Sequence, residues 1–137
     1  MAVLLDPSVI LAAADRADLN HAAAVSWFER VDEPLLLGAL SLAELDVLLQ
    51  RELGPVATRA VVAAIASGAI RLVAPTTADL ETAATLMMER SEHRPRLADA
   101  VLVATAQRLG VRRIATFDRR PLAVLRAAGS RTFDLEP

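Results

Sequence analysis

Four carboxylates of this chain stand where an apolar segment ends or begins, and their positions suggest one shared site. They are Asp6, Glu44, Asp99 and Asp118. The first and the last follow the apolar runs 2–5 and 114–117, which predict buried strands. The other two open apolar stretches that predict helices at 41–53 and 97–109. If the four converge, their oxygens form a cage for one hard divalent cation.

The ion that suits such a cage is Mg²⁺ or Mn²⁺ rather than zinc, because only oxygen ligands are available. The chain has no cysteine, and its two histidines, His21 and His93, show neither metal-ligand nor triad spacing to a partner. Hard divalent ions of this kind suit phosphoryl chemistry.

Each carboxylate taken alone also has a purely structural explanation. Asp6 fits the N-cap of a helix that Pro7 begins, and the segment 41–44 fits an S-x-x-E capping box. Asp99 in a first helical turn suits the helix dipole, and Asp118 suits a turn. For any one of them the structural explanation is favoured. The set favours a metal site, since an unpaired carboxylate in the apolar surroundings of Asp99 would be costly to bury.

Five other acidic residues are expected to be solvated charges: Asp15, Asp18, Glu29, Asp46 and Asp79. Asp46 is only two positions from Glu44, but it projects about 200° away around the helix. Asp79 is also expected to complete a capping box with Thr76 at the start of a helix.

All fifteen basic residues are arginines. The absence of lysine excludes a phosphate-binding P-loop and the aspartyl-phosphate enzymes that place a lysine near the phosphoryl group. Two arginine clusters flank the carboxylates along the sequence, at 90–96 and at 112–120. Their members include Arg94, Arg96, Arg119 and Arg120. These side chains could grip phosphates, although solvated arginines at turns and helix ends are an equally good interpretation.

Composition and length predict one α/β domain over residues 1–137. Short apolar runs predict strands at 3–5, 35–37, 70–73, 113–116 and 131–133. Helical patterns lie between them, at 7–14, 20–30, 41–53, 55–66, 76–90, 97–109 and 121–128. This alternation predicts a mainly parallel sheet of four to five strands flanked by helices. In such sheets ligands bind beyond the carboxyl ends of the strands, where the strand order reverses, and Asp6 and Asp118 would lie at that edge.

The amino-acid composition predicts where the protein is found and what kinds of partner it has. The hydrophobic fraction is 54%, yet no stretch is long enough to span a bilayer, and neither a secretory signal nor a cysteine is present. We therefore expect a cytoplasmic protein without a membrane span. The apolar surplus predicts a subunit or partner interface and a homo-oligomer, a homodimer in the simplest case. The net charge of −2 leaves +2 once the four carboxylates are set aside, so bulk charge does not exclude a nucleic-acid partner.

The chain resembles the PIN-domain family, and within it the VapC-type toxin ribonucleases of bacterial toxin–antitoxin pairs. The resemblance rests on Leu-Asp-Pro-Ser at 5–8, Ser-Leu-Ala-Glu-Leu-Asp at 41–46, Arg-Leu-Ala-Asp-Ala at 96–100 and Thr-Phe-Asp at 116–118. It covers nearly the whole length. One departure is Pro121, which stands where the family often has an aromatic residue.

The resemblance implies a three-layer PIN-like sandwich with Asp6, Glu44, Asp99 and Asp118 as the acidic site and Ser8 and Thr116 as supporting hydroxyls. It implies a type II toxin, an endoribonuclease that needs Mg²⁺ or Mn²⁺ and hydrolyses RNA with a metal-activated water. The implied substrates are structured RNAs such as tRNA or rRNA, which the arginines would contact. The implied partner is a small VapB-type antitoxin that neutralises the enzyme.

Two alternatives remain open at this point. The chain could be a catalytically silent PIN-like module that binds RNA or a partner protein. A metal-free ribonuclease that uses His21 and His93 as acid and base is a weaker possibility, and it would be insensitive to chelation.

Overall fold

The computed structural model describes residues 1–128 and 133–137. Its strands are β1 (Val3–Leu5), β2 (Leu35–Gly38), β3 (Arg71–Val73), β4 (Arg113–Ala115) and β5 (Asp134–Glu136). Its α-helices are α1 (Pro7–Ala14), α2 (His21–Arg30), α3 (Ala39–Glu52), α4 (Pro55–Ala64), α5 (Thr77–Glu89), α6 (Leu97–Leu109) and α7 (Arg119–Ala128). A π-helical turn (Ile65–Ala69) follows α4, and a 3-10 turn (Ser91–His93) precedes α6.

The strands form one sheet in the order β3-β2-β1-β4-β5, and all neighbours pair in parallel. Leu4 in the central strand pairs with Leu36 on one side and with Ile114 on the other. The chain first builds outward from β1 to β3, and then returns to the other side of β1 with β4 and β5. The strand order therefore reverses between β1 and β4, which is where ligands bind in sheets of this kind.

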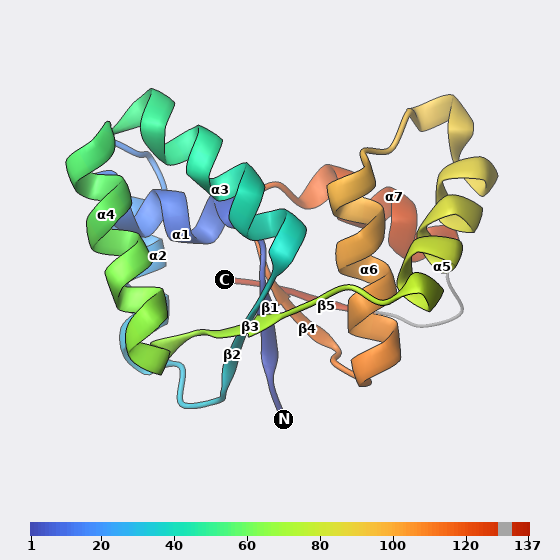
Figure 1. Cartoon of the computed structure of the whole chain (residues 1–137), viewed down its shortest axis with the longest axis horizontal. Coiled ribbons are helices and arrows are strands. Elements are labelled where there is room, and N and C mark those ends of the chain that lie inside the picture. The colour runs from blue at the N-terminus through green and yellow to red at the C-terminus, as the bar shows by residue number, and fades with distance from the viewer. Residues whose placement is uncertain (129–132) are drawn as a thin grey trace.

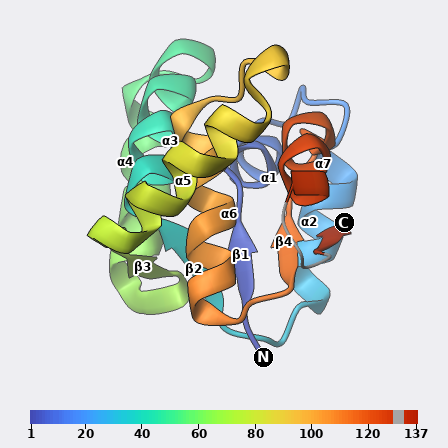
Figure 2. The same cartoon turned by 90° about the vertical axis from the view of Figure 1, so that its right-hand side faces the viewer.

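Helices cover both faces of the sheet, as Figure 1 shows: α1 to α4 lie on one side and α5 to α7 on the other. In the view of Figure 2, α6 lies in front of the sheet, beside β1. The two faces of β1 explain the layering. Val3 and Leu5 are buried in the core beneath α1 and α3, whereas Leu4 is buried in the core beneath α6. Because both faces of such strands are buried, their sequences are continuous hydrophobic runs. The predicted α/β three-layer sandwich is confirmed.

Most element boundaries agree with the predictions to within one or two residues. One difference bears on the site: α3 begins at Ala39, with Gly38 as its N-cap, so the capping-box interpretation of 41–44 is wrong. Likewise α7 begins at Arg119 rather than at 121, and the helix predicted at 55–66 ends at Ala64 in the π-helical turn. The strand predicted at 131–133 lies largely outside the described residues, and the described strand there is β5.

The residues that cap and end the helices are the types expected at these positions. Asp6 is the N-cap of α1 and Pro7 occupies its first position, while Thr76 and Asp79 form the predicted capping box of α5. Gly110 ends α6 with a φ of 66°, a left-handed conformation that glycine adopts without steric cost. Among the described residues, no helix is long and apolar enough to cross a bilayer.

The expectation that Asp79 is a solvated charge is wrong. Its side chain is 2% exposed and accepts hydrogen bonds from Arg108 Nε at 2.9 and 3.0 Å and from Thr105 Oγ1 at 3.3 Å. The Arg108 guanidinium holds the pKa of Asp79 below its usual value. Arg108 lies 29 positions away in the sequence, so local patterning contained no signal of the pair. Of the other four acids, Glu29 and Asp46 are exposed, while Asp15 and Asp18 are half-exposed and accept turn hydrogen bonds.

We expect Arg108→Met to lower the melting temperature by roughly 5 °C at pH 7, because it leaves the Asp79 carboxylate without its cationic partner. The folded pKa of Asp79 is lowered, so the pair's contribution is complete above the usual pKa of about 4 and is lost as the pH falls below it. Thermal unfolding should therefore show a smaller difference in melting temperature between the wild type and Arg108→Met at pH 3.5 than at pH 7. Arg112→Met, at an exposed position, is the control, and an equal loss in both variants would contradict the assignment.

Candidate functional site

The candidate site lies at the carboxyl edge of the sheet, where the strand order reverses. Asp6 comes directly after β1, and Thr116 comes directly after β4. The two strands pair in parallel with Leu5 opposite Ala115, and Asp6 N donates a hydrogen bond to Ala115 O at 2.9 Å. Two segments 110 positions apart in sequence are thereby brought side by side.

Hydroxyl groups hold the Asp6 side chain. Its Oδ2 accepts hydrogen bonds from Thr116 Oγ1 at 3.1 Å, from Ser8 N at 3.1 Å and from Ser8 Oγ at 2.5 Å. The hydroxyls are themselves fixed, since Ser8 Oγ accepts from Phe117 N at 2.9 Å and Thr116 Oγ1 accepts from Asp118 N at 3.0 Å. Asp6 is 8% exposed and Thr116 is fully buried. This network presents one oxygen of Asp6 to its supports and leaves Oδ1 without a hydrogen bond from any described residue.

Asp99 lies half-buried in the first turn of α6. Its pKa is raised to about 6, chiefly by burial and then by the negative charges of Asp6, Glu44 and Asp118, while Arg96 opposes the rise. Burial also raises the pKa of Asp6, against the hydrogen bonds from Ser8 and Thr116. The four predicted carboxylates therefore share one electrostatic neighbourhood.

The carboxylate oxygens are not gathered around a common point. Within residues 1–128 and 133–137, no three histidine, aspartate or glutamate side chains are grouped so that they could hold a metal ion. The contacts explain this arrangement: Asp6 faces its hydroxyl partners, and Glu44 Oε1 lies 3.0 Å from Arg96 Nη2. Asp118 is exposed just ahead of α7.

The chemistry of the donors nevertheless fits a hard cation. All four candidates are carboxylates, and the pKa of Asp99 is raised first by burial and then by the negative charges of the other three. A divalent cation would compensate that charge, and oxygen ligands are those that Mg²⁺ and Mn²⁺ prefer. The side chain of Arg96 would have to leave Glu44 before Glu44 could serve as a ligand.

A cavity of about 320 Å³ opens beside Asp99. Three of the four predicted phosphate-gripping arginines line it, namely Arg94, Arg96 and Arg120. Arg119 is not among its lining residues, and its guanidinium donates to the carbonyl oxygen of Pro137. His93 lines this cavity, whereas His21 Nδ1 lies 2.8 Å from Ala12 O, between α2 and α1. The sequence contained no signal that His93 would face the arginines.

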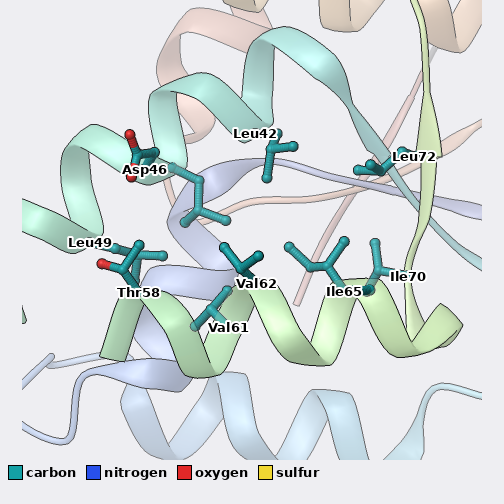
Figure 3. Close-up of a pocket in the computed structure, with 11 residues that line it drawn as sticks. Leu42, Asp46, Leu49, Thr58, Val61, Val62, Ile65, Ile70 and Leu72 are labelled. Atoms are coloured by element: carbon teal, nitrogen blue, oxygen red, sulfur yellow. The ribbon is translucent and has the colours of Figure 1, made fainter. Parts of the chain in front are cut away.

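A second feature is an apolar groove of about 500 Å³ between α3 and α4 (Figure 3). Leu42 and Leu49 line it from α3, Val62 lines it from α4, and Leu72 closes one end from β3. Val62 and Leu72 are about half exposed, at 50% and 52%. The groove is a place where part of the predicted apolar surplus reaches the surface.

Comparisons with known proteins agree with this fold. The family model described as "PIN domain" matches residues 3–127. The chain is 33% identical to Ribonuclease VapC26 of Mycobacterium tuberculosis over 135 residues, which cover 98% of this chain and all of the relative. Among solved structures, Mycobacterium tuberculosis VapC20, described as a sarcin–ricin loop cleaving toxin, superposes with a TM-score of 0.84 at 23% identity, over 98% of this chain and 99% of that chain. FitAcB from Neisseria gonorrhoeae superposes with a TM-score of 0.73 at 17% identity, over 98% and 96% of the two chains.

The crowding of charge predicts that Asp99→Asn stabilises the metal-free protein. Because the folded pKa of Asp99 is raised, its favourable contribution is complete below the usual pKa of about 4 and is lost as the pH rises through about 6. In EDTA the variant should therefore gain about 1 kcal/mol at pH 7.5, after allowance for solvent screening, and almost nothing at pH 4.5. Urea denaturation at both pH values measures this. Asp46→Asn, at an exposed position of α3, is the control, and a destabilised Asp99→Asn at pH 7.5 would show that the charge is already compensated.

The ion pair between Arg96 and Glu44 predicts competition with a bound cation. Arg96→Gln removes the guanidinium that occupies Glu44, so we expect this variant to bind Mn²⁺ a few-fold more tightly than the wild type in isothermal titration calorimetry. Arg51→Gln is the matched control, because Arg51 pairs with Glu52 at the end of α3, the helix that also carries Glu44. Weaker Mn²⁺ binding by Arg96→Gln would contradict the competition.

Proposed function

This chain belongs to the PIN-domain family, and on that premise we propose that it is the ribonuclease toxin of a type II toxin–antitoxin pair. The name of its relative, Ribonuclease VapC26, supports a nuclease. The observation that carries the proposal is the shared electrostatic neighbourhood of four carboxylates at the point where the strand order reverses. The proposed reaction is hydrolysis of an RNA phosphodiester bond in the cytoplasm.

We assign Asp6, Glu44, Asp99 and Asp118 as the residues that hold Mg²⁺ or Mn²⁺. When bound, such an ion activates water as a nucleophile and stabilises the charge that develops on the leaving oxygen. The free Oδ1 of Asp6 suits a ligand, because Ser8 and Thr116 fix the orientation of the carboxylate through Oδ2. These two hydroxyls are positioning groups in this proposal.

One of these four carboxylates has a second role in the proposal. Glu44 or Asp118 orients the attacking water and accepts its proton, and the exposure of Asp118 allows it to reach a bound substrate. The water oxygen forms a bond to phosphorus as the phosphorus–oxygen bond to the leaving nucleotide breaks. Arg94, Arg96, Arg119 and Arg120 are proposed to contact the RNA backbone, for which Arg119 would have to leave the Pro137 carbonyl.

The substrate class and the partners are part of the same proposal. Structured RNA such as tRNA or rRNA is the proposed substrate, and the description of VapC20 as a sarcin–ricin loop cleaving toxin is in keeping with this. Similar solved structures include toxin–antitoxin complexes, which supports a small VapB-type antitoxin as the partner of this chain. A homodimer and a single domain over residues 1–137 also remain predictions.

We expect Asp6→Asn and Asp99→Asn each to reduce RNA cleavage by about 100-fold or more and to relieve growth arrest on induction, because each removes a charged ligand from the site. Cleavage of total cellular RNA with added Mn²⁺ measures the first effect, and the growth of induced cells measures the second. Asp46→Asn serves as the control, since Asp46 is exposed and projects away from Glu44. Undiminished cleavage by both purified variants would refute the proposal.

A catalytically silent RNA- or protein-binding module is the second candidate, and one observation favours it. The carboxylate oxygens are not grouped for an ion among the described residues, and Arg96 already neutralises Glu44. Binding of an antitoxin without cleavage of any cellular RNA in Mn²⁺ would support this candidate. Cleavage that survives EDTA would instead support the histidine mechanism.

A further inference from the structure

The cavity beside Asp99 combines arginines with an apolar wall. Its lining residues are Glu92, His93, Arg94, Pro95, Arg96, Asp99, Arg120, Pro121 and Val124. They come from the turn before α6, from the first turn of α6 and from the start of α7. The volume of about 320 Å³ is at the lower end of the range for small-ligand sites and suits a single nucleotide unit.

The cavity lining holds three arginines against two acidic residues, Glu92 and Asp99, so its formal charge is positive by one with His93 counted as neutral. Among the described residues, Arg94 and Arg120 make no ion pair, and Arg96 pairs with Glu44 outside the cavity. Glu92 is 3.5 Å from His93. The first turn of α6, which has no side-chain cap, adds the positive end of a helix dipole to the same wall. These charges favour an anion that can take several N–H donors, as a phosphate does.

Backbone geometry places one of these arginines. Arg94 has a φ of 48° and a ψ of 55°, a left-handed conformation that is uncommon for a residue other than glycine. Residues held in this way concentrate at ligand sites, where the surrounding structure enforces the conformation. Here it turns the chain from the 3-10 turn Ser91–His93 into Pro95, with Arg94 on the cavity wall.

The apolar part of the lining distinguishes a nucleotide from a simple anion. Pro95, Pro121 and Val124 add hydrocarbon surface to the lining that holds the charged groups, which suits a ribose or the face of a base. Asp99 belongs both to this cavity and to the carboxylate group, so a ligand seated here continues directly into the acidic site. An RNA strand has this alternation of phosphate and apolar surface, and an acidic peptide does not.

We propose that this cavity is an RNA subsite that binds the nucleotide next to the cleaved bond, with Arg94 and Arg120 on its phosphate and Pro95, Pro121 and Val124 against its sugar or base. This inference rests on the proposed nuclease function and deepens it, because it separates substrate positioning from the carboxylates. Arg119, which donates to Pro137 and does not line the cavity, is not part of the subsite.

The test is binding of a fluorescein-labelled, single-stranded 12-nucleotide RNA by fluorescence anisotropy in EDTA, where no metal-dependent cleavage occurs. We expect Arg94→Gln and Arg120→Gln each to weaken binding by roughly fivefold and to reduce the slope of log affinity against log salt by about 0.7, the value for one lost contact to a single strand. Arg94→Lys should recover most of the slope, because it keeps the charge. Arg112→Gln, an exposed arginine at the opposite end of β4, should leave both quantities unchanged.

The outcomes separate this inference from the function on which it rests. If Arg94→Gln and Arg120→Gln bind RNA as the wild type does, while the wild type cleaves RNA in Mn²⁺, the subsite is wrong and the nuclease stands. If the two variants lose affinity but the wild type cleaves nothing, the nuclease fails and the RNA-binding cavity stands. If they weaken binding of a glutamate-rich peptide and not of RNA, the cavity is a protein contact and the inference is overturned. Circular dichroism of each variant confirms that a loss of binding is not a loss of fold.

Discussion

The parallel pairing of β1 with β4 is the constraint on which the rest of the site depends. It brings Asp6, at the end of one strand, against Thr116, at the end of the other: Asp6 N donates to Ala115 O, and Thr116 Oγ1 donates to the Asp6 carboxylate. Because the strand order reverses at this pair, the helices that leave the two halves of the sheet diverge there and open a crevice. Near that edge, Glu44 lies in the second turn of α3 and Asp99 in the first turn of α6.

The carboxylates at this edge, which the proposed chemistry requires, destabilise the folded protein when no cation is bound. Burying several carboxylates together raises the free energy of the folded chain at neutral pH, as the raised pKa of Asp99 records. The protein offsets this cost in different ways: hydroxyl donors hold Asp6, and Arg96 pairs with Glu44. Within residues 1–128 and 133–137, Asp99 has no comparable direct partner. The negative charge at this edge is therefore balanced only in part, and a cation would complete the balance.

Asp79 and the proposed site residue Asp99 are told apart by their surroundings in the fold rather than by their local sequence. Asp79 and Asp99 both lie in the first turn of a helix, and both look alike in the sequence. The Arg108 guanidinium lowers the pKa of the buried Asp79, whereas burial and the nearby negative charges raise the pKa of Asp99. The difference lies in residues that are distant along the chain, so no local pattern could have revealed it. Asp6 shows that the two roles can coincide, because it caps α1 and also belongs to the acidic edge.

The sequence by itself determined the α/β architecture and nearly all of the elements, because apolar periodicity and caps are local properties of the chain. The four acidic positions were predicted from their places at the ends of strands and the starts of helices, and their role as a site stays a prediction. The sequence could not decide where α3 begins, since Gly38 caps that helix in place of the expected Ser41. Only the tertiary structure decided that Asp79 is buried, that Arg96 pairs with Glu44, and that Arg94 and Arg120 face one cavity without Arg119. Those facts depend on contacts between segments far apart in sequence, and such contacts exist only once the sheet has set the helices in place.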